Sequence, residues 1–212
     1  MSTASRDARL VPGVDARTFD AFTSNTVLLD AVERVERHRF VPPTRQMLAY
    51  IDSEISLGQG RRCPAPSAVV QLIDAAQLDD RAVACMWAGS GYVAAVLASM
   101  GLTVHAVESA LPLRQMAMDA LSAIGLAERV VWYDDVESVP ASTVQAAIVC
   151  AAMNRFPRQL LSRLPQDGRL VVPIQRGRQA VISVITRQGH GHRRHDRPAV
   201  QMLSLDGAPM RR

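Results

Sequence analysis

Val83-Ala84-Cys85-Met86-Trp87-Ala88-Gly89-Ser90-Gly91-Tyr92 is the stretch that decides the fold, together with Val107-Glu108 further along the chain. The pattern predicts a strand, a glycine turn, a helix, a second strand and then an acid. Doubly wound α/β proteins build a nucleotide pocket in this way, because the turn brings backbone N–H groups close to the ligand and the acid accepts the ribose hydroxyls. One position departs from this pattern, since Trp87 stands where a tight turn would normally have its first glycine.

Strands and helices alternate on both sides of this stretch. We expect strands over 81–86, 103–107, 129–133, 145–151, 168–173, 180–186 and 200–205, and helices over 27–39, 67–76, 92–100, 113–124 and 156–164. Strands that alternate with helices indicate a parallel sheet, and the turn at 175–178 adds a final antiparallel hairpin. The fold class that the sequence predicts is therefore α/β, with a doubly wound, mostly parallel sheet.

Two of these helices carry more detailed expectations. In the first, an apolar stripe should face the core while Glu33, Arg34, Glu36 and Arg37 face water. In the second, Ser67 is placed to act as the N-terminal cap.

Length and composition favour a single domain. The chain has 212 residues, of which 48% are hydrophobic and 21% charged, so it can bury a full core. Residues 1–20 are polar or small and are expected to be loosely ordered, with one domain over 21–212. No apolar signal core follows the N-terminus, and the longest apolar run, 92–102, is too short to span a bilayer. We therefore expect a cytoplasmic protein with no membrane partner.

The charged residues do not point to a nucleic-acid partner. The formal net charge is +4 and all 24 basic side chains are arginine, yet they are scattered among acids, as codon bias alone would produce. His190, His192 and His195 lie close together, but no set of cysteines or carboxylates completes a metal site around them. We expect this segment to be a polar loop between two strands, with no bound metal. Aromatic residues that would stack on bases are also missing from it.

The cysteines form no disulfide framework, because Cys63, Cys85 and Cys150 are widely spaced and odd in number. Cys85 and Cys150 fall in expected buried strands and are interpreted as core residues. Cys63 stands beside two arginines in a loop that looks exposed, a setting that lowers the pKa of a thiol. No histidine lies near it in the sequence to act as a base, which argues against a catalytic thiol.

Further motifs follow one another in a consistent order along residues 26–205. They are Ala31-Val32-Glu33-Arg34-Val35, Arg39-Phe40-Val41-Pro42, Leu57-Gly58-Gln59, the 89–98 turn and helix, Val107-Glu108, 148–152 and Asp167-Gly168-Arg169-Leu170-Val171-Val172-Pro173. In this order they resemble the protein-L-isoaspartate (D-aspartate) O-methyltransferases. The resemblance implies a Rossmann-like, class I methyltransferase fold. It also implies a protein-repair reaction, in which S-adenosylmethionine methylates the carboxyl group of L-isoaspartyl residues. The implied partner is a damaged protein or peptide, and the enzyme would be a monomer.

The resemblance also assigns site residues. Gly89, Ser90, Gly91, Glu108 and Asp135 would bind S-adenosylmethionine, and residues 58–63 would cover the substrate. The serine of the family's catalytic site falls at Arg62, or at Cys63 if the match slips by one residue. An arginine at this place could pair with a substrate carboxylate, or could mean that the site has been abandoned.

The chain departs from the family at positions that matter for activity. Cys85 and Gln145 stand where the family has acids, Trp87 replaces a glycine, and Arg62 replaces the serine. The Trp87 indole could block the pocket, stack on a ligand or turn into the core. Two functions therefore remain open: an isoaspartate methyltransferase, or a degenerate, catalytically inactive family member that acts as a binding or structural partner.

Overall fold

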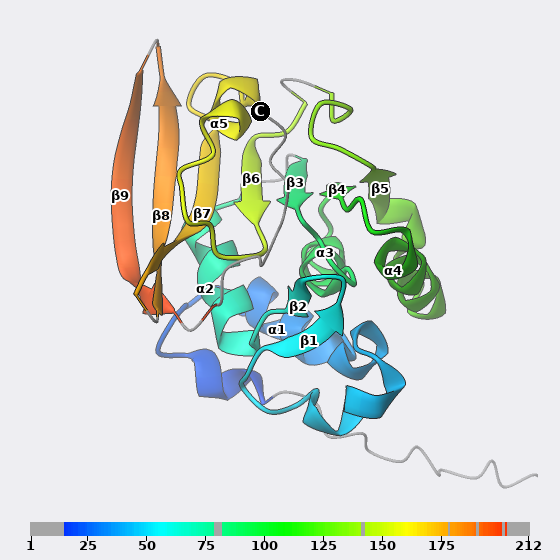
Figure 1. Cartoon of the computed structure of the whole chain (residues 1–212). Helices are drawn as coiled ribbons and strands as arrows, with labels where there is room; N and C mark the ends of the chain where they lie inside the picture. The colour runs from blue at the N-terminus through cyan, green and yellow to red at the C-terminus, as the bar shows by residue number, and fades with distance from the viewer. Residues whose placement is uncertain are drawn as a thin grey trace, which may run out of the picture.

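A seven-stranded sheet forms the centre of the molecule (Figure 1). The computed structural model describes residues 15–78, 82–140, 143–177, 179–189, 191–200 and 202. The strand order is β5-β4-β3-β6-β7-β8-β9, with β3 to β7 parallel and β8 and β9 antiparallel to their neighbours. The strands are β3 (Val83–Met86), β4 (Val104–Val107), β5 (Val130–Tyr133), β6 (Ala146–Val149), β7 (Arg169–Arg176), β8 (Gln179–Gln188) and β9 (Gly191–Val200). The predicted α/β class is confirmed.

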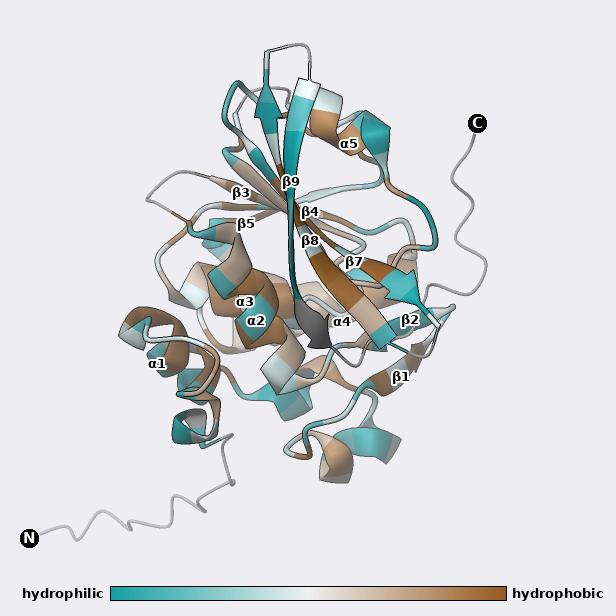
Figure 2. Ribbon diagram, turned by 90° about the vertical axis from the view of Figure 1, so that its left-hand side faces the viewer, coloured by the Kyte–Doolittle hydropathy of each residue, from teal (hydrophilic) through white to brown (hydrophobic). Residues whose placement is uncertain are grey.

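Helices cover both faces of this sheet because successive strand residues point to opposite sides (Figure 2). Val83 belongs to a core shared with four helices, whereas Ala84 and Met86 pack in a second core with Leu160 and Leu161. Burying one such valine or leucine contributes about 1.5–3 kcal/mol. The first face carries α1 (Thr26–Arg34), α2 (Pro66–Ala76), α3 (Tyr92–Ser99) and α4 (Leu111–Ala123), and the second carries α5 (Arg158–Arg163).

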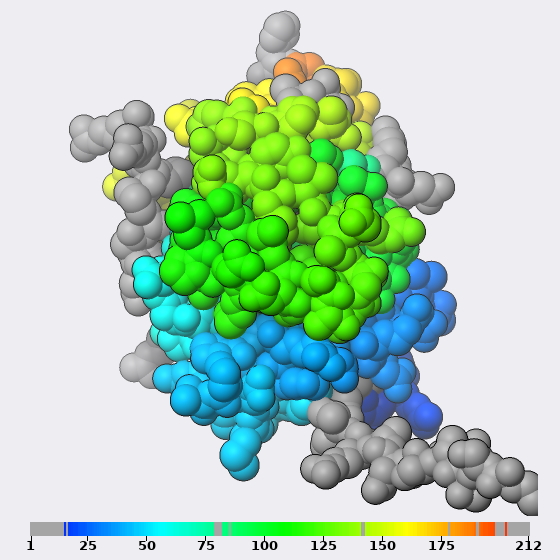
Figure 3. Space-filling model, turned by 90° about the vertical axis from the view of Figure 1, so that its right-hand side faces the viewer, coloured from blue at the N-terminus to red at the C-terminus, as the bar shows by residue number. Residues whose placement is uncertain are grey.

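A separate two-stranded hairpin and four short 3-10 helices complete the described structure. The hairpin consists of β1 (Ile55–Gly58) and β2 (Arg61–Cys63), which pair antiparallel. The 3-10 helices are η1 (Ala16–Phe19), η2 (Arg37–Phe40), η3 (Pro43–Leu48) and η4 (Ala127–Arg129). On the face seen in Figure 3, the segment of residues 25–50 (blue) lies against α4 (green), and η2 contacts α4.

The folded part of the chain begins before residue 21, the start that we predicted for the domain. Phe19 in η1 is buried in the first core, and its ring stacks on Phe22. Residues 1–14 of the segment predicted to be loosely ordered lie outside the described residues.

The predicted end of the first helix and the predicted N-cap of the second helix are wrong. The first helix ends at Arg34 rather than at residue 39, because Val35 adopts an extended backbone, and η2 replaces the last predicted turn. In the second helix Ser67 is not the N-cap. The cap position is Ala65, and the backbone N–H of Ser67 donates instead to the Asp52 carboxylate, 2.9 Å away.

The polar histidine segment is a strand, so the predicted loop over 189–196 is wrong. A turn at Gly189 (φ +54°) reverses the chain, and β9 then pairs with β8 from Gln188↔Gly191 onward. Its polar side chains are tolerated because β9 is the edge strand and lies against water (Figure 2). His190 and most of the strand predicted over 200–205 lie outside the described residues, and Met202 is not in a strand.

Within the described ranges, no helix is both long and apolar enough to cross a membrane. Nor do three or more histidine, cysteine, aspartate or glutamate side chains gather there in a group that could hold a metal ion.

Candidate functional site

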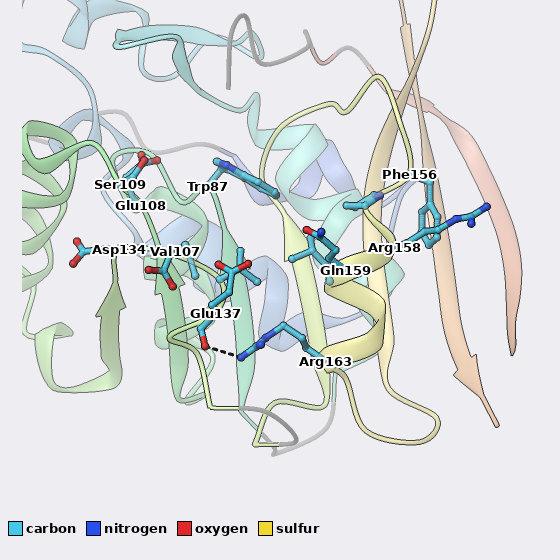
Figure 4. A pocket seen from close by; sticks show the side chains of 14 residues that line it. Trp87, Val107, Glu108, Ser109, Asp134, Glu137, Phe156, Arg158, Gln159 and Arg163 are labelled. Atoms are coloured by element: carbon cyan, nitrogen blue, oxygen red, sulfur yellow. Dashed lines mark hydrogen bonds between the residues drawn. The ribbon is translucent and has the colours of Figure 1, made fainter. Parts of the chain in front are cut away.

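A pocket of about 520 Å³ lies where the parallel strands end. Its walls come from the segments that follow four strands, as Figure 4 shows. This edge is the crevice in which open α/β sheets bind ligands, since the chain leaves β3 toward β4 while β6 lies on the other side of β3. The volume is that of an ordinary small-molecule site. The lining residues are Trp87, Val107, Glu108, Ser109, Asp134, Asp135, Val136, Glu137, Phe156, Pro157, Arg158, Gln159, Leu160 and Arg163.

Glu108 directly follows β4 and is the buried acid of this pocket. Its side chain has no exposed surface. The backbone N–H of Ala110 donates to Oε1 at 3.0 Å, and the backbone N–H of Gly89 donates to Oε2, also at 3.0 Å. A guanidinium N–H, Nε of Arg61, donates to Oε2 at 3.0 Å as well. The carboxylate is therefore held by the glycine turn, by its own strand end and by the hairpin.

The backbone of the glycine turn is preserved although its first position is tryptophan. Trp87 has φ +54°, close to the +57° of Gly89, and Gly91 follows at +84°. A left-handed conformation costs a non-glycine residue roughly 1–2 kcal/mol. In Figure 4 the indole lies between Glu108 and Phe156. Trp87 forms part of the wall and leaves the pocket open.

Gly89, Ser90 and Gly91 do not line the pocket. A Cβ on Gly89 would lie 3.2 Å from Leu57 Cδ1, because the hairpin covers this glycine. A Cβ on Gly91 would lie only 2.8 Å from the Cβ of Ala117 on α4. The Ser90 Oγ is buried and has no hydrogen-bond partner among the described residues. The turn thus packs against the hairpin and α4, and it meets the pocket through Trp87 and Glu108.

Asp135 lines the pocket from the segment after β5 and is an exposed residue. Its carboxylate accepts the backbone N–H of Ser138 at 2.7 Å, and hydrogen bonds from Ser138 lower the pKa of Asp135. Arg163 on α5 also lines the pocket. One of its guanidinium nitrogens donates to the carbonyls of Glu137 (2.8 Å) and Val139 (2.7 Å), and the first of these hydrogen bonds is dashed in Figure 4.

The hairpin residues Arg62 and Cys63 lie apart from the pocket lining. Arg62 is half-buried and pairs with Ser56 in the β1–β2 ladder. Cys63 is buried, and burial raises the pKa of its thiol. The expectation of an exposed loop cysteine with a lowered pKa is therefore wrong, because β2 turns this side chain into the core.

Arg37 forms hydrogen bonds to the segments before β1 and after β2, although we expected it to face water. It is fully buried, and its guanidinium donates to the carbonyls of Ala49 (2.7 Å), Ser53 (2.9 Å) and Pro64 (2.8 Å). Its guanidinium carbon also lies 5.6 Å from the centre of the Tyr92 ring. The early end of α1 moves Arg37 off the helix and makes this burial possible.

Gln145 and Cys85, which stand where the resemblance leads us to expect acids, lie at different places along the strands. Gln145 precedes β6, and its backbone N–H donates to Ala82 O just before β3. It lies at the amino ends of the strands, away from the pocket, so this departure does not alter the site. The backbone of Cys85 is the third position of β3 and pairs with β4 and β6.

Sequence reasoning gave Phe156 and Arg163 no role in the site, and it named Arg61 only as part of the substrate-covering segment 58–63. Phe156 follows β6, so the rule that ligands bind at carboxyl ends of parallel strands could have found it. Arg61 contacts a residue 47 positions away in the chain, and Arg163 contacts residues 26 and 24 positions away. Contacts at such separations leave no local sequence pattern.

Comparison with known proteins relates most of the chain to one family. The model of the family "Protein-L-isoaspartate(D-aspartate) O-methyltransferase (PCMT)" matches residues 15–203. A protein-L-isoaspartate O-methyltransferase of Methylorubrum populi is 36% identical over 167 residues, which cover 78% of this chain and 79% of the relative. The enzyme of the same name from Pseudomonas fluorescens is 32% identical over 200 residues, 92% of this chain and 94% of the relative.

Solved structures show the same fold at lower identity. A protein-L-isoaspartate O-methyltransferase from Plasmodium falciparum, solved with S-adenosyl-L-homocysteine, superposes with a TM-score of 0.72 and 17% identity over 90% of this chain and 96% of that one. A second protein-L-isoaspartate O-methyltransferase structure gives a TM-score of 0.75 and 19% identity over 91% of this chain and 65% of that one.

Proposed function

Because the chain belongs to the protein-L-isoaspartate(D-aspartate) O-methyltransferase family, we propose that it uses S-adenosylmethionine to methylate the carboxyl group of L-isoaspartyl residues in damaged proteins. One observation carries the proposal. A buried acid, Glu108, borders an open pocket at the carboxyl ends of the strands, beside a turn that keeps its glycine backbone. This is the place where the fold accepts a nucleotide.

The residues of the pocket suit the adenosine part of the cofactor. A carboxylate is the acceptor that a ribose diol needs, and Glu108 supplies it. Trp87 and Phe156 supply an aromatic wall for a purine, and the exposed Asp135 is a further acceptor in the pocket lining. When bound, S-adenosylmethionine supplies the methyl group. We therefore propose Glu108, Asp135 and Trp87 as its binding residues. The Gly89–Gly91 turn, which does not line the pocket, contributes by holding Glu108 through the Gly89 N–H.

The reaction asks little acid–base work of the protein, because the isoaspartyl carboxylate is itself the nucleophile. The chain must orient that carboxylate and exclude water around it. The β1–β2 hairpin is placed for this role, since it packs over Gly89 next to Glu108. We propose that this hairpin covers the substrate, and that Arg62 in it is the candidate to pair with the substrate carboxylate.

We further propose a cytoplasmic monomer whose partners are damaged proteins and peptides, with no role for nucleic acid or a membrane. Cys63 is a free thiol, which suits a reducing compartment. Light scattering coupled to size-exclusion chromatography tests the monomer, for which the mass should be that of one 23.1 kDa chain.

A methylation assay tests the proposed function. The full chain is incubated with S-adenosylmethionine and a peptide that contains L-isoaspartate, and base-labile methyl ester is measured. The matched control is the same peptide with ordinary aspartate, which should remain unmethylated. Calorimetric titration with S-adenosylhomocysteine accompanies the assay. Binding without methylation of either peptide would favour the non-catalytic alternative, and absence of binding at millimolar ligand would contradict the proposal.

A further inference from the structure

A buried ion pair joins the substrate hairpin to the ribose-binding acid. Arg61 on β2 and Glu108 after β4 are 47 residues apart in the sequence, yet their Nε and Oε2 atoms are 3.0 Å apart. The side chains are 9% and 0% exposed, respectively. The acid that should accept the ribose therefore has no free surface while the hairpin is in this position.

The hydrogen bonds of Glu108 leave too few lone pairs for a ribose diol. Each carboxylate oxygen offers about two acceptor sites. On Oε2 both are taken, one by the Gly89 N–H and one by Arg61, whereas Oε1 accepts only the Ala110 N–H. A diol that donates one hydroxyl to each oxygen needs one site on each. Two of these three donors are backbone groups of the fold, so Arg61 is the donor that can leave.

The hairpin is built so that its tip can move while its base stays fixed. Arg37 fixes the base through the carbonyls of Ser53 and Pro64. The tip, residues 58–60, is exposed and has left-handed backbone at all three positions (φ +81°, +54° and +67°). A Cβ on Gly58 would meet no atom within 4 Å. Arg61 directly follows this free tip, so a small displacement of the tip would draw it away from Glu108.

We propose that Arg61 is a latch that closes the hairpin over Glu108, and that S-adenosylmethionine must displace Arg61 to bind the acid through both ribose hydroxyls. Cofactor binding thereby frees the hairpin that covers the substrate. Binding of the cofactor and binding of the substrate are linked because the cofactor and Arg61 compete for the same oxygen, Oε2 of Glu108. The inference rests on the proposed function, because it assumes that Glu108 binds the ribose.

Substitution of Arg61 tests the latch without an activity assay. In Arg61→Gln the charged competitor is gone, and S-adenosylhomocysteine should bind about tenfold more tightly by calorimetry, since a hydrogen bond to a charged group is lost from the free state only. The control is Arg45→Gln, an exposed arginine of η3, which removes the same charge from a residue that does not donate to Glu108 and should leave the affinity unchanged. Thermal unfolding of each variant verifies that it is folded.

Hydrogen exchange of the unmodified protein gives a second test that needs no variant. On addition of S-adenosylhomocysteine, the backbone amides of residues 58–62 should exchange several-fold faster, while those of β3 and β4 slow or stay constant. Slower or unchanged exchange of the hairpin would overturn the latch, as would equal or weaker binding by Arg61→Gln.

The outcomes separate the latch from the proposed function. Equal binding by the unmodified protein and Arg61→Gln overturns the latch and leaves the methyltransferase proposal intact. Binding by Arg61→Gln alone supports the latch. Failure of both to bind, with both proteins folded, overturns the cofactor assignment and the latch with it.

Discussion

At the scale of single residues, the site is governed by side chains that stand in unusual settings. Trp87 occupies a left-handed position suited to glycine, and Arg37 is buried without a carboxylate beside it among its described hydrogen-bond partners. The sequence shows that these residues are present, but it does not show the left-handed backbone of Trp87 or the burial of Arg37. The turn motif identified position 87 as abnormal, whereas helical periodicity placed Arg37 on the wrong side because it could not foresee the early end of α1.

Trp87→Gly is expected to relieve backbone strain and to remove part of the pocket wall. Because the indole lines an open pocket, binding of S-adenosylhomocysteine should weaken about tenfold, as expected from the loss of one aromatic stacking surface. Calorimetry measures the affinity. Tighter binding would show instead that the indole obstructs the ligand.

A fluorescence control follows from the tryptophan content. The chain has 2 tryptophans, and Trp132 on β5 does not line the pocket. In Trp132→Phe the remaining emission comes from Trp87, so titration with S-adenosylhomocysteine should change it. Constant emission at saturating ligand would place Trp87 away from the bound cofactor.

Arg37→Met should lower the free energy of unfolding by about 3–5 kcal/mol, because removal of a buried charged partner leaves carbonyls of Ala49, Ser53 and Pro64 without their donor. Urea denaturation measures the change. Arg34→Gln is the matched control, since Arg34 is exposed and forms a surface ion pair with Asp30, and it should cost at most about 1 kcal/mol. Similar losses in the two variants would refute a special role for Arg37.

At the scale of elements, the strands and helices of the sheet could be predicted, and the edges and connections could not. Periodicity located β3 to β8 and four of the five helices to within a few residues. The exception is the edge strand β9. Its polar sequence shows no apolar alternation, and it is a strand because its backbone pairs with β8. The short strands β1 and β2 were missed as well, because a strand of three or four residues has no detectable period.

Gly91, the N-cap of α3, packs closely against Ala117 on α4. Gly91→Ala should destabilise the protein by about 2–5 kcal/mol, the sum of a left-handed backbone cost and of overpacking against Ala117. Gly125→Ala is the control, because it has a similar φ of +71° but its Cβ would meet no atom within 4 Å. It should cost only about 1–2 kcal/mol. Equal losses in urea denaturation would show that the Ala117 contact is unimportant.

At the scale of the whole molecule, the family and the fold could be predicted from the sequence, but the contacts between side chains in the site could not. The order of the motifs indicated the family, and the carboxyl-end rule indicated the edge of the sheet. The ion pair of Glu108 with Arg61 depends on how the hairpin packs over the sheet, which is a long-range property without a local signature. The sequence also treated Gln145 as part of a drifted site, although it lies at the opposite end of the strands.

The stability of the whole fold should fall in alkaline solution. Burial raises the pKa of the Cys63 thiol above its usual 9.0 and that of the Tyr92 hydroxyl above its usual 10.0. A raised folded-state pKa gives stability that is fully present below the unfolded-state value and is lost as the pH rises toward the folded-state value. The free energy of unfolding should therefore decrease from about pH 9 upward, in the range set by these groups.

Tyr92→Phe separates the contribution of the tyrosine. Its hydroxyl is buried without a hydrogen-bond partner in the described structure, so its removal should leave stability unchanged or slightly higher near neutral pH. Above about pH 10 the variant should lose less stability than the unmodified protein, as urea denaturation at stepped pH would measure. An identical alkaline decline in both proteins would contradict the assignment to Tyr92.

The left-handed backbone at Trp87 also bears on how this site can change by mutation. Tryptophan has a single codon, TGG, which differs from the glycine codon GGG at one base. Since the turn already has the conformation that glycine prefers, the reversal needs one nucleotide change and no rearrangement of the chain around it. The departure at the turn is thus one that selection can undo in a single step.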